Sequence, residues 1–225
     1  MRPDLRHRIR RNALSIAAGL TLIAGMARAQ TVWPGDFVSR LEALALLQSL
    51  NADLLSHDSA TATLTRWCGD HRLAPQAKIV ALREPGNVPA DAQVLQALKA
   101  GPDTPIRHRR VKLACGDRVL SEADNWYLPG KLTPDMNRTL DTTTTPFGAV
   151  VKGLNFQRRT LSAQPLFDPL PAGWDLSPPP AQAGDMTIPH QVIQHRAVLT
   201  AAGEPFSYVI ETYTDKVLPE GPVGR

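Results

Sequence analysis

The sequence is poor in the residues that build disulfide-dense or metal-stapled folds. Two cysteines among 225 residues are too few for a scaffold held by several disulfides. The six histidines are scattered, and none has the spacing of a metal site. The sequence therefore predicts neither a metal nor any other cofactor. A hydrophobic content of 43% is enough for an ordinary packed core.

Outside the N-terminal segment, the sequence also has no excess of basic residues. The whole chain has a formal net charge of +4. However, six of its 25 basic residues and one of its 21 acidic residues lie in residues 1–29, which leaves 19 basic and 20 acidic residues in the remainder. The basic signal therefore belongs to the N-terminal segment, and we expect no nucleic-acid partner.

Residues 1–29 have the layout of a secretory signal peptide. A basic stretch from Arg2 to Arg11 precedes an apolar run from Ala13 to Met26, and Ala27-Arg28-Ala29 before Gln30 fits a small-x-small cleavage site. The run is shorter than the ~20 residues that span a bilayer, so an N-terminal membrane anchor is the less favoured alternative. We expect the protein to be exported, periplasmic or secreted, with no membrane contact after cleavage.

Residues 30–225 are expected to form one domain, because no later segment is long enough to fold apart from the rest. A helix capped by Asp36 should run to about Leu55, with leucines at three- and four-residue spacing. A proline-rich stretch, residues 165–189, reads as a long surface loop. The remaining pattern predicts strands at 61–68, 79–83, 106–115, 118–129, 157–163, 191–200 and 206–217, and short helices at 89–101, 135–140 and 147–152. Thr133-Pro134 and Thr145-Pro146 are expected to cap and open the last two of these helices.

This pattern predicts an α+β fold, a single domain in which helices pack on one face of an antiparallel sheet of about six strands. Two hairpins are expected in that sheet, one turning at Gly116-Asp117 and one across residues 202–204. Two short helices flanking the threonine run 142–145 would suit a lid over a pocket.

Two charged residues occur where the strand pattern predicts burial. With a period of two, Arg109 shares a face with Val111 and Leu113, whereas Arg110 lies on the other face. Glu211 alternates with Val209 and Tyr213 in the last strand. A buried guanidinium needs an anion. Either Arg109 and Glu211 pair with each other, or they serve a ligand.

Three short motifs in this order resemble the chorismate lyase (chorismate-pyruvate lyase) family, over roughly residues 41–218. They are RRVKLAC at Arg109–Cys115, TPFG at Thr145–Gly148 and IETY at Ile210–Tyr213. The resemblance implies that Arg109 and Glu211 frame a buried aromatic ligand beneath two flaps, with Arg110 as the alternative arginine. It also implies that Ala60 or Thr61 and Phe147 are the flap residues that touch the ligand.

The function implied by the resemblance is the cofactor-free elimination of pyruvate from chorismate, which yields 4-hydroxybenzoate, with Arg109 and Glu211 as catalytic residues. Export separates the protein from chorismate, which is made in the cytoplasm. An exported, non-catalytic binding module for a small aromatic carboxylate is therefore the alternative, and whether the chain is an enzyme stays open. The expected partner is such a small ligand, and the expected state is a monomer.

Export would also place the two cysteines in an oxidising compartment. Cys68 and Cys115 both lie near the ends of predicted strands, and we expect them to form a disulfide. Two buried free thiols are the alternative.

Overall fold

A computed structural model of the chain describes residues 32–177 and 184–222. The chain separates into two units at Gln30/Thr31, and all described residues belong to the second. The signal peptide predicted for residues 1–29 lies outside the described residues. Within the described ranges, no helix is long and apolar enough to cross a membrane.

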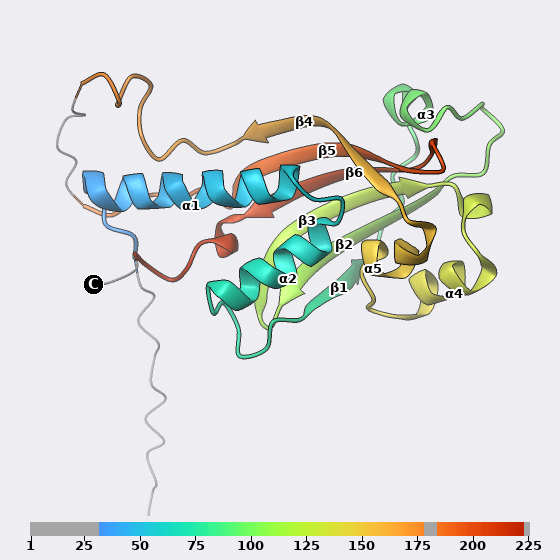
Figure 1. Ribbon diagram of the computed structural model, residues 1–225, viewed down its shortest axis with the longest axis horizontal. Helices are drawn as coiled ribbons and strands as arrows, with labels where there is room; N and C mark the ends of the chain where they lie inside the picture. The colour runs from blue at the N-terminus through green and yellow to red at the C-terminus, as the bar shows by residue number, and fades with distance from the viewer. Residues whose placement is uncertain (1–31, 178–183, 223–225) are drawn as a thin grey trace, which may run out of the picture. The chain divides into compact units, whose positions relative to one another are not determined.

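The described chain forms a six-stranded antiparallel sheet with five α-helices, which confirms the predicted α+β class (Figure 1). The strand order is β1-β2-β3-β6-β5-β4. The strands are β1 (Ile79–Glu84), β2 (Arg107–Cys115), β3 (Arg118–Tyr127), β4 (Gln157–Pro165), β5 (Gln191–Ala201) and β6 (Glu204–Thr214). The helices are α1 (Phe37–Leu55), α2 (Ala60–Asp70), α3 (Ala92–Leu98), α4 (Pro134–Thr142) and α5 (Phe147–Val150), with short 3-10 turns at Pro129–Lys131, Val151–Leu154 and Asp215–Val217.

Both predicted hairpins are present, and each turn has a glycine at a positive φ. Gly116 between β2 and β3 has a φ of 56°. Ala202 and Gly203 between β5 and β6 have φ values of 49° and 81°. Positive φ at both central residues is the geometry of the two-residue hairpin turn that matches the twist of the strands. The last hairpin is therefore tighter than predicted, because β6 already begins at Glu204.

Helices α1 and α2 lie across one face of the sheet, and α4 and α5 lie beside them towards one end (Figure 1). Leu47, Leu50 and Leu54 of α1 belong to the same buried cluster as Val111 and Val209 of the sheet. Asp36 caps α1 as predicted, because its carboxylate accepts a hydrogen bond from the Ser39 amide at 3.0 Å. This face of the sheet holds the main core.

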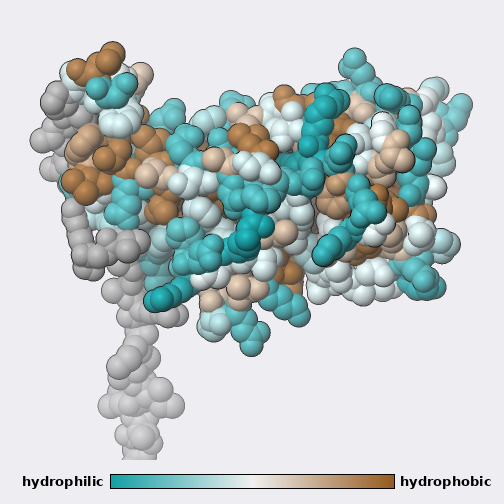
Figure 2. Space-filling model, in the orientation of Figure 1, coloured by the Kyte–Doolittle hydropathy of each residue, from teal (hydrophilic) through white to brown (hydrophobic). Residues whose placement is uncertain are grey.

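Helix α3 covers part of the opposite face. Val94 and Leu98 of α3 pack in one buried cluster with Trp126, Val198 and Tyr208. These three sheet residues have the opposite strand parity to Val111 and Val209, so an apolar patch exists on the second face and α3 shields it from water. Apolar residues also gather near the start of α1, on a surface that is otherwise mostly hydrophilic (Figure 2). Val32, Phe37, Val38 and Leu41 are the exposed apolar residues there.

The strand predicted at residues 61–68 is wrong, since these residues form helix α2. Threonines at alternating positions favoured a strand, but the buried residues Ala60, Thr63, Leu64, Trp67 and Cys68 follow the three- and four-residue spacing of a helix. Ser59 caps the helix by accepting a hydrogen bond from the Ala62 amide at 3.2 Å. Burial against the sheet outweighed the strand preference of the threonines.

The cap predicted at Thr145 is also wrong. The residue before α5 is Pro146, and no side chain caps that helix. The Thr145 Oγ1 instead accepts a hydrogen bond from the Thr143 hydroxyl at 2.9 Å, and the Thr145 amide donates to the Thr143 Oγ1 at 3.1 Å. Thr133, by contrast, caps α4 as predicted, accepting from the Met136 amide at 3.2 Å.

Cys68 and Cys115 form a disulfide that ties α2 to the end of β2. The two residues are 47 positions apart, and both are fully buried. A covalent link over that distance removes chain entropy from the unfolded state, which corresponds to roughly 4 kcal/mol in the chain-entropy model. The disulfide is consistent with an oxidising compartment.

Replacing both cysteines with alanine should therefore lower the free energy of unfolding by about 2–4 kcal/mol. Urea unfolding of the double variant and of the wild type would measure the difference. The wild type under non-reducing conditions should also show no alkylatable thiol by mass spectrometry. Two reactive thiols in the native protein, or a loss of less than about 1 kcal/mol, would contradict this prediction.

Candidate functional site

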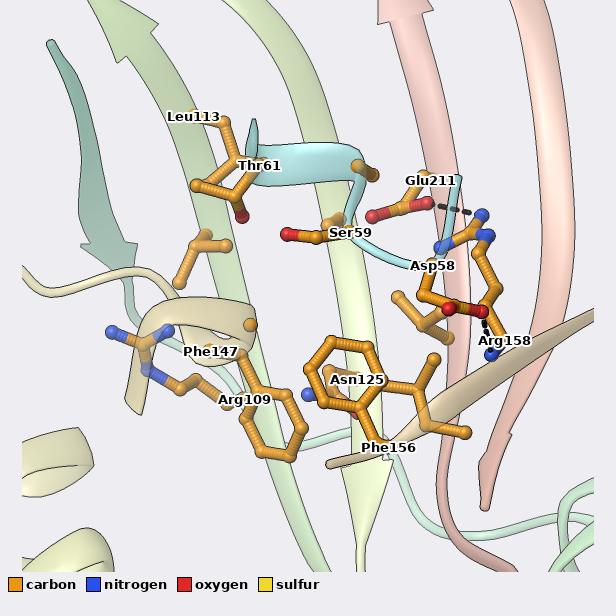
Figure 3. A pocket seen from close by; sticks show the side chains of 16 residues that line it. Asp58, Ser59, Thr61, Arg109, Leu113, Asn125, Phe147, Phe156, Arg158 and Glu211 are labelled. Atoms are coloured by element: carbon orange, nitrogen blue, oxygen red, sulfur yellow. Dashed lines mark hydrogen bonds and ion pairs between the residues drawn. The ribbon is translucent and has the colours of Figure 1, made fainter. Parts of the chain in front are cut away.

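A small pocket lies between the sheet and the flap helices, with a cavity of about 50 Å³. Its walls come from the middle of β2, β3 and β6, the first residues of α2, the start of α5 and the segment around Phe156 (Figure 3). The lining residues are Asp58, Ser59, Ala60, Thr61, Arg109, Val111, Leu113, Ala123, Asn125, Phe147, Gly148, Phe156, Arg158, Leu199, Val209 and Glu211. Every flap and strand position expected from the sequence is among them.

The two flaps meet over the pocket at Gly148. A Cβ atom at this position would lie 3.3 Å from the Ser59 Oγ and 3.6 Å from the Thr61 Oγ1. The first of these distances is tighter than an ordinary contact, so the absence of a side chain lets α5 approach the start of α2. On the other side, the Asp58 carboxylate accepts a hydrogen bond from the Arg158 amide at 2.7 Å, which attaches the α2 flap to β4.

Arg109 is buried without an anionic partner. The residue is only 4% exposed, yet the described part of the chain offers it no ion pair. Its Nη2 donates to the Thr145 carbonyl at a long 3.4 Å, and its buried Nε has no hydrogen-bond partner among the described residues. Burial, reinforced by the nearby positive charge of Arg83, lowers the pKa of Arg109. A ligand anion would relieve this cost.

Arg110 takes no part in the pocket, because it lies on the other face of the sheet. Its guanidinium makes a two-pronged ion pair with Asp124, with distances of 2.9 Å and 2.8 Å. The strand parity that favoured Arg109 over Arg110 therefore places the two side chains as predicted.

Glu211 pairs with Arg158 and not with Arg109. The Arg158 Nη2 lies 2.6 Å from the Glu211 Oε2, and the two side chains are 4% and 9% exposed. The Tyr213 hydroxyl donates to the same carboxylate oxygen at 3.2 Å. Figure 3 shows the other carboxylate oxygen facing the pocket, while the Arg109 guanidinium points away from Glu211. The direct Arg109–Glu211 pair considered from the sequence does not form.

The pocket thus has two polar ends and an apolar middle. Arg109 is at one end, and the Glu211–Arg158 pair is at the other (Figure 3). Between them lie the rings of Phe147 and Phe156, with aliphatic side chains from the sheet. Such a site suits a flat apolar body that carries a negative group on one side and a hydrogen-bond donor on the other.

Asn125 adds a polar group in the middle of the pocket. Its Oδ1 accepts a hydrogen bond from the Ser207 hydroxyl at 2.6 Å, which fixes the amide. Asn125 stands directly opposite Arg109 in the sheet register. Counting back from the Gly116-Asp117 turn would have put Asp124 there, but a bulge between Leu113 and Ala114 shifts the register by one residue. Strand alternation in β3 could therefore have placed Asn125 on the pocket face only if the position of the bulge had been known.

Arg158 was also missed by sequence reasoning. It lies at the start of β4, an edge strand that pairs only with β5 within the described sheet. Its side chain reaches Glu211 across β5, so neither strand alternation nor sequence neighbours would indicate the contact. The one feature of the sequence that could have pointed to Arg158 is an arginine within a strand that was expected to join the sheet.

Behind the ion pair, His195 of β5 is fully buried. Its Nε2 lies 2.8 Å from the Asn51 Oδ1, and its Nδ1 has no hydrogen-bond partner within residues 32–177 and 184–222. Burial, followed by the positive charge of Arg158, lowers the pKa of His195 to about 4, although Glu211 acts in the opposite direction. The imidazole is therefore neutral in the folded protein at neutral pH.

Stability should consequently depend on His195 in mildly acidic solution. In the unfolded chain the His195 imidazole binds a proton below about pH 6.5, whereas in the folded chain it does so only below about pH 4. The free energy of unfolding should then fall, by up to about 3 kcal/mol, as the pH drops from 6.5 to 4. His195→Gln, whose amide can still donate to Asn51, should lose this part of the slope. Equal slopes in urea unfolding of the two proteins across this range would contradict the prediction.

Among the described residues, no group of three or more histidine, cysteine, aspartate or glutamate side chains could hold a metal ion. The fold and the pocket together define a single-domain α+β protein with a small, roofed cavity, polar at both ends. No family model matches the chain.

The chain belongs to the same family as the uncharacterized protein y4mC of Sinorhizobium fredii (strain NBRC 101917 / NGR234). The two are 52% identical over 194 residues, which cover 84% of this chain and 82% of the relative. The name of that relative states no activity, so the family assigns no function to this chain.

Solved structures show a more distant likeness. PhnF from Mycobacterium smegmatis is 12% identical, over 74% of this chain and 67% of that one, with a TM-score of 0.47. The effector domain of PhnF is 10% identical, over 70% of this chain and 89% of that one, with a TM-score of 0.44. The possible transcriptional regulator YydK from Bacillus subtilis is 13% identical, with a TM-score of 0.37. That match covers 60% of this chain and spans only 58% of YydK.

Proposed function

We propose that the protein is exported and that its roofed pocket binds a small aromatic carboxylate. The observation that carries this proposal is the asymmetry of the two buried charges. Glu211 already has a cationic partner in Arg158, whereas Arg109 has no anionic partner among the described residues. A buried cation without a partner is costly, and a ligand carboxylate would supply the missing charge and up to two hydrogen bonds.

The rest of the pocket favours an aromatic ring that carries a hydroxyl group. Phe147 and Phe156 flank the space next to Arg109, and offset stacking on such rings adds to the burial of apolar area. At the far end, the free oxygen of Glu211 can accept a hydrogen bond from the ligand. 4-Hydroxybenzoate has this layout, with a carboxylate and a hydroxyl at opposite ends of the ring.

The flaps must open to admit such a ligand. The cavity of about 50 Å³ is smaller than the ~150 Å³ of an engineered cavity that binds benzene. The roof can provide the space, because α5 is a four-residue helix without a side-chain cap. We propose that Ala60, Thr61 and Phe147 contact the ligand and that the segment bearing Phe147 moves as the ligand enters.

A second candidate is the lyase reaction of the family that the motifs resemble. In the conversion of chorismate to 4-hydroxybenzoate, a ring carbon–oxygen bond breaks and a ring proton is lost. The departing enolpyruvate gains a proton and leaves as pyruvate. The two polar ends of the pocket favour this candidate, because chorismate carries a ring carboxylate that could pair with Arg109 and, on the far side of the ring, a hydroxyl that could donate to Glu211. Arg109 and Glu211 would then be the catalytic residues.

One experiment separates binding from turnover. The purified protein is incubated with chorismate, and 4-hydroxybenzoate is measured by chromatography; in parallel, 4-hydroxybenzoate is titrated into the protein by calorimetry. Binding without product supports the binding module, and product formation that Arg109→Met abolishes supports the lyase. Neither heat nor product would refute both candidates.

Export has its own test. Expressed in a bacterium, the protein should be recovered outside the cytoplasm with an N-terminus at or near Gln30. Full-length protein retained in the cytoplasm would contradict export and leave the pocket proposal standing.

A further inference from the structure

A second hollow lies on the outer side of Arg109, on the same face of the sheet. Its cavity of about 350 Å³ is larger and more open than the roofed pocket. Arg83, Arg107, Arg109, Tyr127 and Asp141 line it, and we call it the arginine recess. Arg83 is paired in register with Val111, and Arg107 lies two residues before Arg109, so the three arginine side chains leave the sheet from one face.

The positive charge in the arginine recess is not balanced by the acids that line it. Asp141 is the one carboxylate among its lining residues, against three guanidinium groups. The Asp141 Oδ2 accepts from the Arg107 Nη1 at 2.9 Å, and the Asp141 backbone oxygen accepts from the Arg83 Nη1 at 2.5 Å. Both arginines thus converge on the end of α4.

Arg109 forms the inner wall of the arginine recess as well as one end of the roofed pocket. It is more than nine-tenths buried, and no residue in the described part of the chain bonds its Nε. Besides the Thr145 carbonyl, to which its Nη2 donates, the titratable groups that act on its guanidinium are Arg83, Tyr127 and Asp141, and these three line the recess. Among these, Arg83 repels it. Of the three guanidinium groups, only that of Arg107 bonds the Asp141 carboxylate. The recess therefore has an excess of positive charge, and an open hollow, that an anion could occupy.

We propose that the arginine recess is a second binding site, for a small oxyanion, held by Arg83, Arg107 and Arg109. Carboxylate and phosphate each present a pair of oxygens that a guanidinium can bind with two parallel hydrogen bonds, and both would fit the open hollow. The site lies outside the roof, so an anion reaches it without movement of α5. It does not require the roofed pocket to bind an aromatic acid.

Chemical-shift perturbation in two-dimensional ¹H–¹⁵N spectra of the purified protein tests this proposal. Sodium acetate and sodium phosphate are titrated separately, with sodium chloride holding the ionic strength constant. The reporters are the backbone amides of Asn87 and Arg107, which line the arginine recess. We expect saturable shifts at both amides with one or both anions, and the anion that saturates at the lower concentration identifies the oxyanion type.

Matched variants assign the effect to the recess. Arg83→Gln/Arg107→Gln should raise the apparent Kd at least tenfold. Arg110→Gln/Arg196→Gln removes the same charge from the opposite face of the sheet and should leave the Kd unchanged. Shifts that stay linear to the highest concentration, or that weaken equally in both double variants, would overturn the proposal. Shifts at Val209 with 4-hydroxybenzoate report the roofed pocket separately, so failure of the proposed function would leave this result intact.

Discussion

Replacing Arg109 with methionine should weaken binding of 4-hydroxybenzoate by roughly 3–6 kcal/mol, since two charge-assisted hydrogen bonds of about 1.5–3 kcal/mol each would be lost. A Kd in the micromolar range would then rise by at least about a hundredfold. The free energy of unfolding should stay the same or rise by about 1 kcal/mol, because no ion pair of Arg109 is broken and an apolar side chain fills the site. Affinity and stability should therefore respond in different directions.

The matched control for this variant is Arg110→Met. Arg110 is adjacent in sequence, carries the same charge and lies on the other face, in its ion pair with Asp124. Its replacement should leave the affinity for 4-hydroxybenzoate within about twofold of the wild type, since Arg110 does not line the pocket, and should cost little stability, since surface ion pairs contribute little. Calorimetric titration and thermal melts of both variants provide the comparison. Equal loss of affinity in the two variants would show that general charge, and not the position of Arg109, decides binding.

Replacing Arg158 with methionine should destabilise the fold by about 3–5 kcal/mol, because the variant leaves the buried Glu211 carboxylate without its cation. The double variant Arg158→Met/Glu211→Gln should recover much of this loss, since the remaining amide is neutral. Urea unfolding of both single variants and the double variant gives the coupling energy of the pair. Arg159→Met, the exposed neighbour, is the control and should change stability by less than about 0.5 kcal/mol.

Additive effects of the two single replacements would contradict the buried pair. The ion pair also holds Glu211 at the end of the pocket, so Arg158→Met should weaken ligand binding as well as stability. This behaviour differs from that expected of Arg109→Met, which should affect binding alone. The two variants together separate the residue that contacts the ligand from the residue that positions the glutamate.

The burial of Arg109 and Glu211 could be predicted from strand alternation alone. A period of two depends only on local backbone geometry, and both residues lie well inside their strands. The same argument separated Arg109 from Arg110. Strand alternation could not predict which residues contact Arg109 and Glu211. Those contacts depend on which strands are neighbours in the sheet and on where a strand contains a bulge. The bulge between Leu113 and Ala114 is such a case, since it sets Asn125 and not Asp124 opposite Arg109.

The error at α2 has a different cause. Thr61, Thr63 and Thr65 have both the alternation and the β-branching of a strand, and the competing signal is a single serine cap at Ser59. The Thr65 hydroxyl bonds the Thr61 carbonyl at 2.8 Å, so a polar β-branched residue is accommodated within the helix. The local sequence does not decide between helix and strand here. Packing against the sheet and the disulfide at Cys68 favour the helix.

The arrangement of the flaps follows from the sequence only in part. The helices around the threonine run were expected, and Ala60, Thr61 and Phe147 line the pocket as the family resemblance implied. The contact between the flaps at Gly148 and the attachment of Asp58 to β4 join segments about 90 to 100 residues apart. No local pattern specifies such contacts, because they depend on how the completed sheet places the flaps.

We propose that Arg109 binds a ligand carboxylate at one end of a pocket that also accommodates an aromatic ring. The most direct test is a calorimetric titration of the purified wild-type protein with 4-hydroxybenzoate, repeated with 4-hydroxybenzamide, which keeps the ring and the hydroxyl but carries no charge. We predict saturable binding of one 4-hydroxybenzoate per chain, and binding of the amide that is weaker by at least tenfold. Equal affinity for the acid and the amide, or no heat with either, would contradict the claim.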